Sequence, residues 1–310
     1  MFGKRRDGKL LKDIDPIVAL TPYIMPMRCD AQVFMGFKVD YETLARYIVE
    51  QGQKGHKITF LEILIASFVH TVAEIPEVNR FIVNKRMYSR KELAVSFALL
   101  KNTSEEGKIE ENTVKCLFDP TDTIYDVADR VSRTIEENRK EEADNSTMKV
   151  AKLLTRPILA NTVVGLARLL DRYGIMPKYI LNASPFHTSL FITNMASIGM
   201  PAVRHHIYNF GTTTMFFSIG SVERTVTMEN GKAVRKRLLP IGVTADERIC
   251  AGAMYARLVA GMKYCLAHPS VLEQPAEHVR FEENNVYHVE KPQGREEKLA
   301  AEESKNALTE

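Results

Sequence analysis

The passage from strand to helix around residue 246 is the feature of this sequence that most limits its fold. A strand pattern ends near Ala245, and apolar residues at helical spacing then continue until Pro269 stops them. The residues between the two patterns read Asp-Glu-Arg-Ile-Cys-Ala-Gly-Ala, from Asp246 to Ala253. A strand that passes directly into an amphipathic helix predicts a sheet covered by helices.

The composition sets the size of the core and excludes one class of partner. With 310 residues, of which 45% are hydrophobic, the chain has enough apolar material for one large domain or two small ones. The net charge is only +3, and basic residues cluster only at 4–6 and 235–237. We therefore expect no nucleic acid as a partner, because a basic stripe with stacking aromatic residues is missing.

Three features of the sequence indicate where the protein is located and whether it binds a metal. Cys29, Cys116, Cys250 and Cys265 are far apart in the sequence, so we expect neither a metal site nor disulfides. No apolar signal-peptide core follows the N-terminus. The most apolar stretch, 58–75, contains two glutamates and a histidine, which indicates a buried helix and not a membrane span. We expect a cytoplasmic protein without a membrane partner.

Local signals predict the remaining elements. Asp40 and Thr59 are each suited to cap a helix, and Thr59 is followed by Glu62 in a capping box. A helix is expected over 123–142, and another over 148–172 that is bent or broken at its proline. Strands are expected at 33–39, 93–99, 189–194 and 212–220, and in a hairpin that turns at 229–232.

These elements predict an α+β fold, in which a mixed β-sheet is covered by helices. Residues 1–20 form a polar N-terminal lead-in, and residues 21–272 form one domain. Residues 273–310 are polar and poor in apolar side chains, which predicts a flexible tail. The sequence has no internal repeat.

Five segments carry a resemblance when they are read in order. They are Phe37–Leu44, a helix ending in Pro-Glu-Val-Asn (Lys57–Asn79), Phe-Ile-Thr-Asn-Met (Phe191–Met195), Ile-Tyr-Asn before a strand (Ile207–Gly220), and Asp246–Ala253. Together they resemble the catalytic domain of dihydrolipoamide acyltransferases, the cores of 2-oxoacid dehydrogenase complexes, over roughly residues 30–272. Chloramphenicol acetyltransferase shares that fold.

The resemblance implies a fold, an assembly and a reaction. The fold is the one found in chloramphenicol acetyltransferase, and copies of the chain form trimers or larger assemblies with an active-site channel between subunits. The reaction is acyl transfer between a thioester carrier and coenzyme A, so coenzyme A or acyl-coenzyme A is the expected substrate. We see no lipoyl domain in the chain, and a separate lipoyl- or acyl-carrier protein is therefore an expected partner.

The chain departs from the family motif at the two positions that carry its chemistry. The motif reads Asp-His-Arg-x-x-Asp-Gly-Ala, whereas this chain has Glu247 for the histidine and Ala251 for the second aspartate. A histidine accepts a thiol proton readily at neutral pH, because its pKa lies near 6.5. The pKa of a glutamate near 4.3 is about 4 below that of a thiol, a mismatch of roughly 6 kcal/mol. Burial would raise the pKa of Glu247 and so reduce the mismatch, whereas an Arg248 side chain turned inward would lower that pKa again.

Two interpretations of Glu247 follow. Either it works as a base of reduced strength, or it is a surface or salt-bridged residue left after catalysis was lost. Thr193 stands where the family has a serine that stabilises the oxyanion, and it either donates to substrate or bonds to backbone within its strand. Asp246, Arg248 and Gly252 keep the structural positions of the motif, and the glycine suits a tight strand-to-helix junction.

A second candidate base lies upstream of the junction. His205 and His206 are followed by Ile-Tyr-Asn-Phe-Gly, which superficially resembles the His-His-x-x-x-Asp-Gly motif of chloramphenicol acetyltransferase. A strand follows these histidines, whereas a helix follows the genuine motif, so His206 is either a displaced base or part of a surface pair. Asn209 keeps the asparagine of the family's Ile-x-Asn-Pro-Pro segment. His187 and Cys250 are expected to be structural.

These observations lead to two functional hypotheses. The first is an acyltransferase of weak or altered activity whose site is built from Glu247, Thr193 and His206. The alternative is a catalytically inactive homologue that acts as a trimeric scaffold or as an acyl-coenzyme A-binding module. The catalytic histidine and aspartate of the motif are absent in both cases, and the acyl group and its acceptor are left open.

Overall fold

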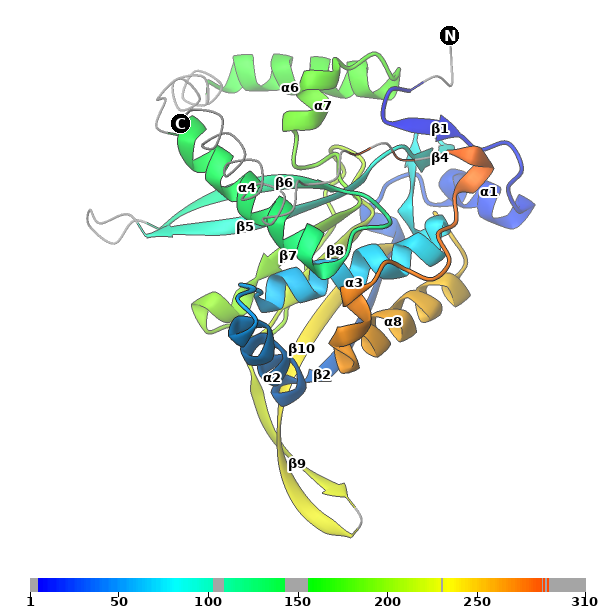
Figure 1. Ribbon diagram of the computed structural model, residues 1–310. Coiled ribbons are helices and arrows are strands. Elements are labelled where there is room, and N and C mark those ends of the chain that lie inside the picture. The colour runs from blue at the N-terminus through cyan, green and yellow to red at the C-terminus, as the bar shows by residue number, and fades with distance from the viewer. Residues whose placement is uncertain are drawn as a thin grey trace, which may run out of the picture.

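A twisted mixed sheet forms the centre of the computed structural model, which describes residues 5–102, 109–142, 156–229, 231–285, 287 and 289 (Figure 1). Six of its seven strands lie in the order β2-β10-β8-β7-β5-β6. The seventh, β9, pairs with β10 alone among the described strands. The β7 strand is parallel to β5 and β8, whereas the other neighbours are antiparallel. The strand bounds are β2 Gln32–Asp40, β5 Leu93–Asn102, β6 Ile109–Phe118, β7 Leu190–Asn194, β8 Met215–Ile219, β9 Glu223–Glu229 and β10 Lys232–Asp246.

Four helices cover one face of this sheet, which we call the inner face. They are α2 (Tyr41–Gln53), α3 (Phe60–Glu74), α4 (Ile124–Glu142) and α8 (Gly252–Ala267). The α3 helix is apolar on most sides because it lies between the sheet and both α4 and α8. Its Phe68 ring meets Phe217 of β8 edge to face, with ring centroids 5.9 Å apart, at the centre of the core.

The opposite face of the sheet, the outer face, carries no helix across its central strands (Figure 1) among the residues described. The loop 199–214 lies over it, and its Ile207 packs with Phe191 of β7 and Phe216 of β8 in a small apolar cluster. Ser218 of β8 donates its hydroxyl to the Val203 carbonyl at 2.6 Å, which ties the loop to the sheet. This face therefore has a small apolar cluster with polar side chains beside it, and the large core lies on the inner face.

A second, smaller sheet packs beside the first. Its strands are β1 (Gly8–Leu10), β4 (Arg86–Arg90) and β3 (Arg80–Val83), in that order, and α1 (Pro16–Ile24) follows β1 in the chain. The segment expected to be a flexible tail, 273–310, is described only in its first part, and that part packs here. Asn285 donates to the Ser89 hydroxyl at 3.0 Å and to the Arg90 carbonyl at 2.7 Å.

The remaining helices and 3₁₀ turns complete the described chain. They are η1 Cys29–Ala31, η2 Pro76–Asn79, α6 Pro157–Arg172, α7 Lys178–Ala183, η3 Met195–Ile198, η4 Pro269–Glu273 and η5 Glu282–Asn284. The helix expected over 148–172 is found from Pro157 onward, where the proline occupies the first helical turn; residues 143–155 lie outside the described residues. Within the part of the chain that is described, no helix combines the length and apolarity that crossing a membrane requires.

Candidate functional site

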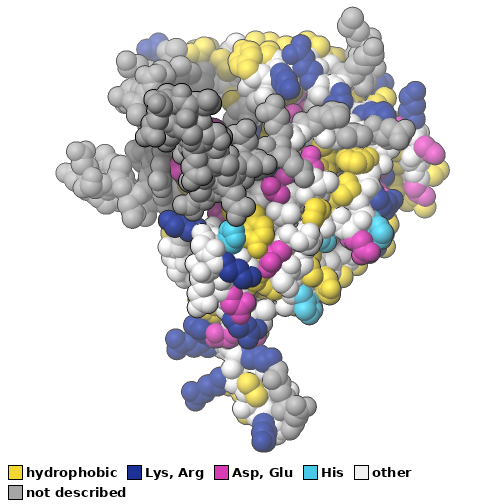
Figure 2. Space-filling model, viewed as in Figure 1, with side chains coloured by type: hydrophobic (Ala, Val, Ile, Leu, Met, Phe, Trp, Pro, Cys, Tyr) yellow, Lys and Arg dark blue, Asp and Glu magenta, His cyan; other side chains and the backbone are white. Residues whose placement is uncertain are grey.

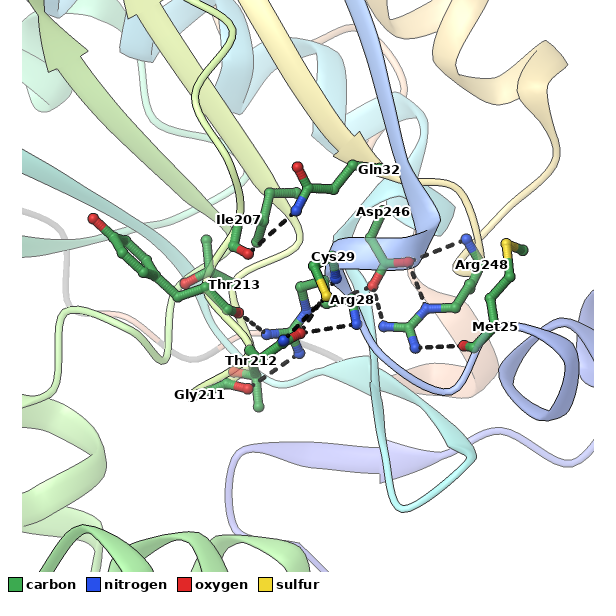
Figure 3. A network of polar contacts seen from close by, with 12 residues as sticks. Met25, Arg28, Cys29, Gln32, Ile207, Gly211, Thr212, Thr213, Asp246 and Arg248 are labelled. Carbon is green, nitrogen blue, oxygen red and sulfur yellow. Dashed lines mark hydrogen bonds and ion pairs between the residues drawn. The ribbon is translucent and has the colours of Figure 1, made fainter. Parts of the chain in front are cut away.

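Asp246, the last residue of β10, forms a buried ion pair with Arg248 two residues later (Figure 3). The Arg248 side chain donates from Nε to Oδ1 at 2.8 Å and from Nη2 to Oδ2 at 2.7 Å, and its backbone N–H also donates to Oδ1. Nη1 donates to the Met25 carbonyl at 3.0 Å. A bidentate pair of this kind fixes the turn geometry, because both partners are removed from water.

Arg28 joins the same carboxylate to the loop on the outer face. Its Nε lies 3.5 Å from Asp246 Oδ2, and its guanidinium donates to the carbonyls of Tyr208 and Gly211. Complete burial lowers the pKa of Arg28, and the Asp246 carboxylate opposes that shift. One carboxylate is thus shared by two arginines that come from segments far apart in the sequence. The shared charge locks the β10–α8 turn, the η1 segment and the loop 199–214 together.

Asn209 makes the second connection between η1 and this loop. Its Oδ1 accepts from the backbone N–H groups of Arg28 and Cys29, at 3.0 and 3.3 Å. Its Nδ2 donates to the Cys29 sulfur at 3.3 Å. Gly211, in the same loop, adopts φ +81°, and a Cβ there would lie 2.2 Å from the Phe186 carbonyl oxygen. Only glycine fits this close approach.

Glu247 lies exposed on the turn between β10 and α8. Its backbone N–H donates to the Ala31 carbonyl at 2.9 Å, so the turn is fixed although the carboxylate reaches solvent. Arg248 does turn inward, but its partner is Asp246 and not Glu247. The arginine therefore supports the loop without engaging the candidate base.

The start of α8 leaves open space next to this turn. Gly252 is its first residue, and a Cβ built there meets nothing within 4 Å, so neither sterics nor a positive φ requires a glycine within one chain. A glycine fits this junction, but the described chain does not require one there. Ala251 is the N-cap and has no side-chain acceptor for the first N–H groups. Cys250 is buried, and burial raises the pKa of its thiol to about 12, as expected for a structural cysteine.

Thr193 lies half-buried on the outer face, at the far end of the central strands from Glu247. It pairs with Ser218 on β8, whereas Asp246 bonds to Thr214 beyond the other end of that strand. Thr214 and Ser218 are four residues apart along the chain, which corresponds to about 13 Å in an extended strand. One chain thus does not bring Thr193 and Glu247 together. The Thr193 hydroxyl lies 3.7 Å from the Met195 sulfur.

His206 is exposed on the loop 199–214 and belongs to a group of aromatic rings. His205 stacks on Phe216 with ring centroids 3.9 Å apart, and His206 stacks on His205 at 4.6 Å. Burial against these rings lowers the pKa of His205, which favours its neutral form. Tyr208 meets the His206 ring edge-on at 5.1 Å. The histidine pair therefore lies on the same face of the sheet as Thr193 and Asp246.

His187 is buried and belongs to a different network, as expected for a structural histidine. Its Nδ1 lies 2.7 Å from the Ser184 hydroxyl, and its Nε2 lies 3.5 Å from an Asp171 oxygen. Arg5 donates to the same carboxylate at 2.6 Å and binds Asp7 through two nitrogens. This network attaches the end of α6 to the small sheet. It has no contact with the β10–α8 turn among the interactions described.

Arg28 and Cys29 are the site residues that the sequence analysis missed. Arg28 follows an Ile-Met-Pro-Met stretch that has no strand or helix signal, and its partner lies 218 positions later. The one signal in the sequence was a basic residue, Arg28, shortly before the first strand of the large sheet. A hollow of about 530 Å³ opens beside it, lined among others by Arg28, Asn209, Arg248 and the end of α6.

The described residues contain no group of three or more His, Cys, Asp or Glu side chains placed to hold a metal ion. No protein-family model matches the sequence, and the search of curated proteins found no match either. Solved structures, in contrast, resemble the fold across most of its length. One is the cubic core of a pyruvate dehydrogenase multienzyme complex, with a TM-score of 0.53 and 14% identity, covering 85% of this chain and 94% of that one.

Two further structures agree with the first. A probable dihydrolipoamide acetyltransferase from Listeria monocytogenes has a TM-score of 0.51 at 12% identity, covering 84% of this chain and 95% of the other. The truncated catalytic core of the 2-oxoacid dehydrogenase complex from Thermoplasma acidophilum has a TM-score of 0.50 at 13% identity, covering 84% and 98%. This chain has the fold of the dihydrolipoamide acyltransferase catalytic core. The expected α+β architecture is thereby confirmed.

Proposed function

We propose that this protein is an acyltransferase-type protein that binds coenzyme A or acyl-coenzyme A at a site completed between copies of the chain. The observation that carries the proposal is the buried Asp246–Arg248–Arg28 cluster. It holds the β10–α8 turn in a fixed shape and leaves Glu247 exposed on the outside of that turn. This cluster supports the proposal that the frame of an acyl-transfer site is kept while the residue at the base position has changed.

A trimer would bring the separated groups together. Thr193 and Glu247 lie at opposite ends of the central strands, so Thr193 of one copy would have to face Glu247 of the next. The open space at Gly252 supports an approach from another copy, because no described residue of the same chain lies within 4 Å of a Cβ built there. In this arrangement Glu247 would remove the thiol proton and Thr193 would donate to the oxyanion of the attacked thioester.

His206 supplies the second candidate for the base. It is exposed on the loop that Arg28 and Asn209 hold against the turn, and a neutral imidazole matches a thiol better than a carboxylate does. Separate variants distinguish the two candidates. If Glu247 is the base, Glu247→Gln abolishes thiol release from acyl-coenzyme A and His206→Ala leaves most of it; if His206 is the base, the pattern reverses.

Binding and turnover are measured separately on the wild-type protein. We expect coenzyme A and acetyl-coenzyme A to raise the thermal midpoint, because a ligand that binds only the folded state stabilises it. Thiol release is then followed with a colorimetric reagent. The double variant Glu247→His with Ala251→Asp restores the family motif, and we expect it to transfer acetyl groups at least tenfold faster than wild type. Absence of both binding and turnover, in wild type and in this variant, would refute the proposal.

The exposure of Glu247 favours one second candidate, a homologue that binds acyl-coenzyme A without reacting. A base needs a desolvated site, and in the single chain this carboxylate has none. Binding in the absence of turnover by wild type, together with recovery of turnover in the restored variant, would select this candidate.

A further inference from the structure

The α6 helix leaves an unusual amount of apolar side-chain surface uncovered. The exposed fractions are 85% for Ile158, 54% for Leu166 and 50% for Leu169. The helix lies along one end of the molecule, and apolar and basic side chains gather over it (Figure 2). It is attached mainly at its C-terminal end, where Asp171 and Met176 are buried. A cluster of large apolar side chains that the described part of the chain leaves exposed indicates contact with something else.

These exposed residues form one continuous strip along the helix. At 100° per residue, Ile158, Leu166, Leu169 and Tyr173 fall within roughly 80° of one another. Half-buried Ala167 lies about 140° from the middle of the strip, whereas half-buried Leu170 lies only about 40° from Leu166. The strip is therefore the exposed flank of the apolar side of α6, and one of its edges adjoins the residues that face the molecule.

Basic side chains border this strip. Arg156, Arg168, Arg172 and Lys178 are exposed, whereas the single acidic residue between 156 and 183, Asp171, is buried against Arg5. The exposed charges of this segment are thus all positive. Arg168 and Arg172 lie on the helix flank next to the strip, and both also line the hollow between α6 and α1. The α1 helix contributes Pro22 to this hollow and also carries exposed apolar residues, among them Ile24.

We propose that α6, with the chain that leads to α7, is a docking surface for an anionic lipid bilayer, on which the helix lies in the plane of the interface. The apolar strip enters the boundary between headgroups and acyl chains, and the flanking arginines reach the lipid phosphates. A second α6 is a poor occupant, because pairing the two helices would bring like charges together. A purely acidic protein surface would match the arginines but not the strip of leucine and isoleucine.

The dimensions of the segment agree with this orientation. Sixteen residues of helix span about 24 Å, which is enough to lie along a membrane and less than the thickness of its hydrocarbon core. Tyr179 of α7 is also exposed, and tyrosine is enriched at the level of the headgroups. The expectation of no membrane partner came from the lack of a spanning segment and does not bear on a helix that lies on the surface.

Vesicle sedimentation with the full chain tests the proposal. We expect the protein to pellet with vesicles of phosphatidylcholine and phosphatidylserine in a two-to-one ratio, and to bind pure phosphatidylcholine vesicles about tenfold more weakly. The double variant Leu166→Asp and Leu169→Asp should lose at least tenfold in binding to the mixed vesicles. Arg168→Gln with Arg172→Gln should reduce the preference for the mixed vesicles and its sensitivity to salt.

The matched control places the same two charges on another apolar surface. The control variant is Val226→Asp with Met228→Asp on β9, where the two side chains are 62% and 69% exposed. The β9 strand projects from the end of the molecule opposite to α6 (Figure 1). This variant should bind vesicles like wild type. The proposal is overturned if wild type does not pellet with mixed vesicles, or if the leucine variant pellets as well as wild type. It is also overturned if the leucine variant changes only the association state in lipid-free buffer, which would assign the strip to a second copy of the chain.

Discussion

Asp246 determines the local structure of the candidate site more than any other residue that the structure describes. Its carboxylate is fully buried, forms the ion pairs with Arg28 and Arg248 among the described residues, and fixes both the turn that bears Glu247 and the segment before β2. Burial of three charged groups in one place is tolerated because nearly every donor has an oxygen partner. The same arrangement makes the cluster sensitive to the loss of one member.

We predict that Asp246→Asn lowers the free energy of unfolding by about 3–5 kcal/mol, because it leaves two buried arginines without a counter-charge. Urea denaturation followed by circular dichroism measures this. The neighbouring change Glu247→Gln is the control, since this side chain is exposed, and it should alter stability by less than about 0.5 kcal/mol. Equal effects of the two substitutions would contradict the burial of Asp246.

The sequence allowed part of this site to be predicted at the level of residues. The junction at 246–253 was found because a strand pattern meets a helix pattern there, and Asp246 and Arg248 do form its structural pair. Arg28 was missed because its partner is 218 positions away, a separation that only the folded sheet closes. Gly252 fits the expected strand-to-helix junction, but a Cβ there would meet nothing within 4 Å, so the described chain does not explain why this position is a glycine.

The caps of α3 and α8 show what local sequence controls at the scale of elements. In α3 the expected capping box forms, with the Thr59 side chain accepting from the Glu62 N–H and the Glu62 side chain accepting from the Thr59 N–H. In α8 the cap position is Ala251, which offers no such acceptor. The helix that carries the candidate site therefore begins with a weaker local signal than the helix in the core.

We predict that Ala251→Ser and Ala251→Asp each raise the free energy of unfolding by about 1 kcal/mol, because a side-chain oxygen would accept from the first N–H groups of α8. The reverse change in α3, Thr59→Ala, should lower it by about the same amount. Thermal and urea unfolding of the three variants measure these differences. A loss of stability in both Ala251 variants would mean that the cap geometry at this turn differs from the one described.

Elements that depend on local signals were predicted well, and those that depend on distant contacts were not. The starts of α2 at Asp40 and α3 at Thr59 follow from capping chemistry within four residues. The sheet of β1, β4 and β3 joins residues 8–10 to residues 80–90, and its strands are too short for a periodic signal. The polar composition of residues 273–310 predicts a flexible tail; in its described part, Asn285 is buried against β4 of that same sheet and Tyr287 against Asn79 of η2.

The whole molecule has two features that a single copy does not satisfy. The β2 strand is an edge of the large sheet and runs for nine residues without a proline. An edge of this kind exposes unpaired backbone groups and favours pairing with another chain. Next to the outer face, Ile198, Met200 and Val222 are exposed, and the Ser221 N–H bonds to the Met200 carbonyl, which places the last two together. The order and type of the elements could be predicted from the sequence. A site shared between copies could not, because it would depend on surfaces such as these, which form only when the chain is folded.

The last prediction concerns this apolar patch of Ile198, Met200 and Val222. If it joins copies, sedimentation equilibrium of the wild type should give about three times the chain mass of 35.1 kDa, because burying the patch removes apolar surface from water. Ile198→Asp with Met200→Asp should give the single-chain mass, since it would bury two unpaired charges at the contact. Val49→Asp, an exposed apolar side chain on α2 and on the helix-covered side, should leave the trimer intact. If Thr193 and Glu247 meet across two copies as proposed, acyl-coenzyme A binding should be lost with the trimer in the first variant and kept in the second. A monomeric wild type that binds the ligand would contradict both the assembly and the shared site.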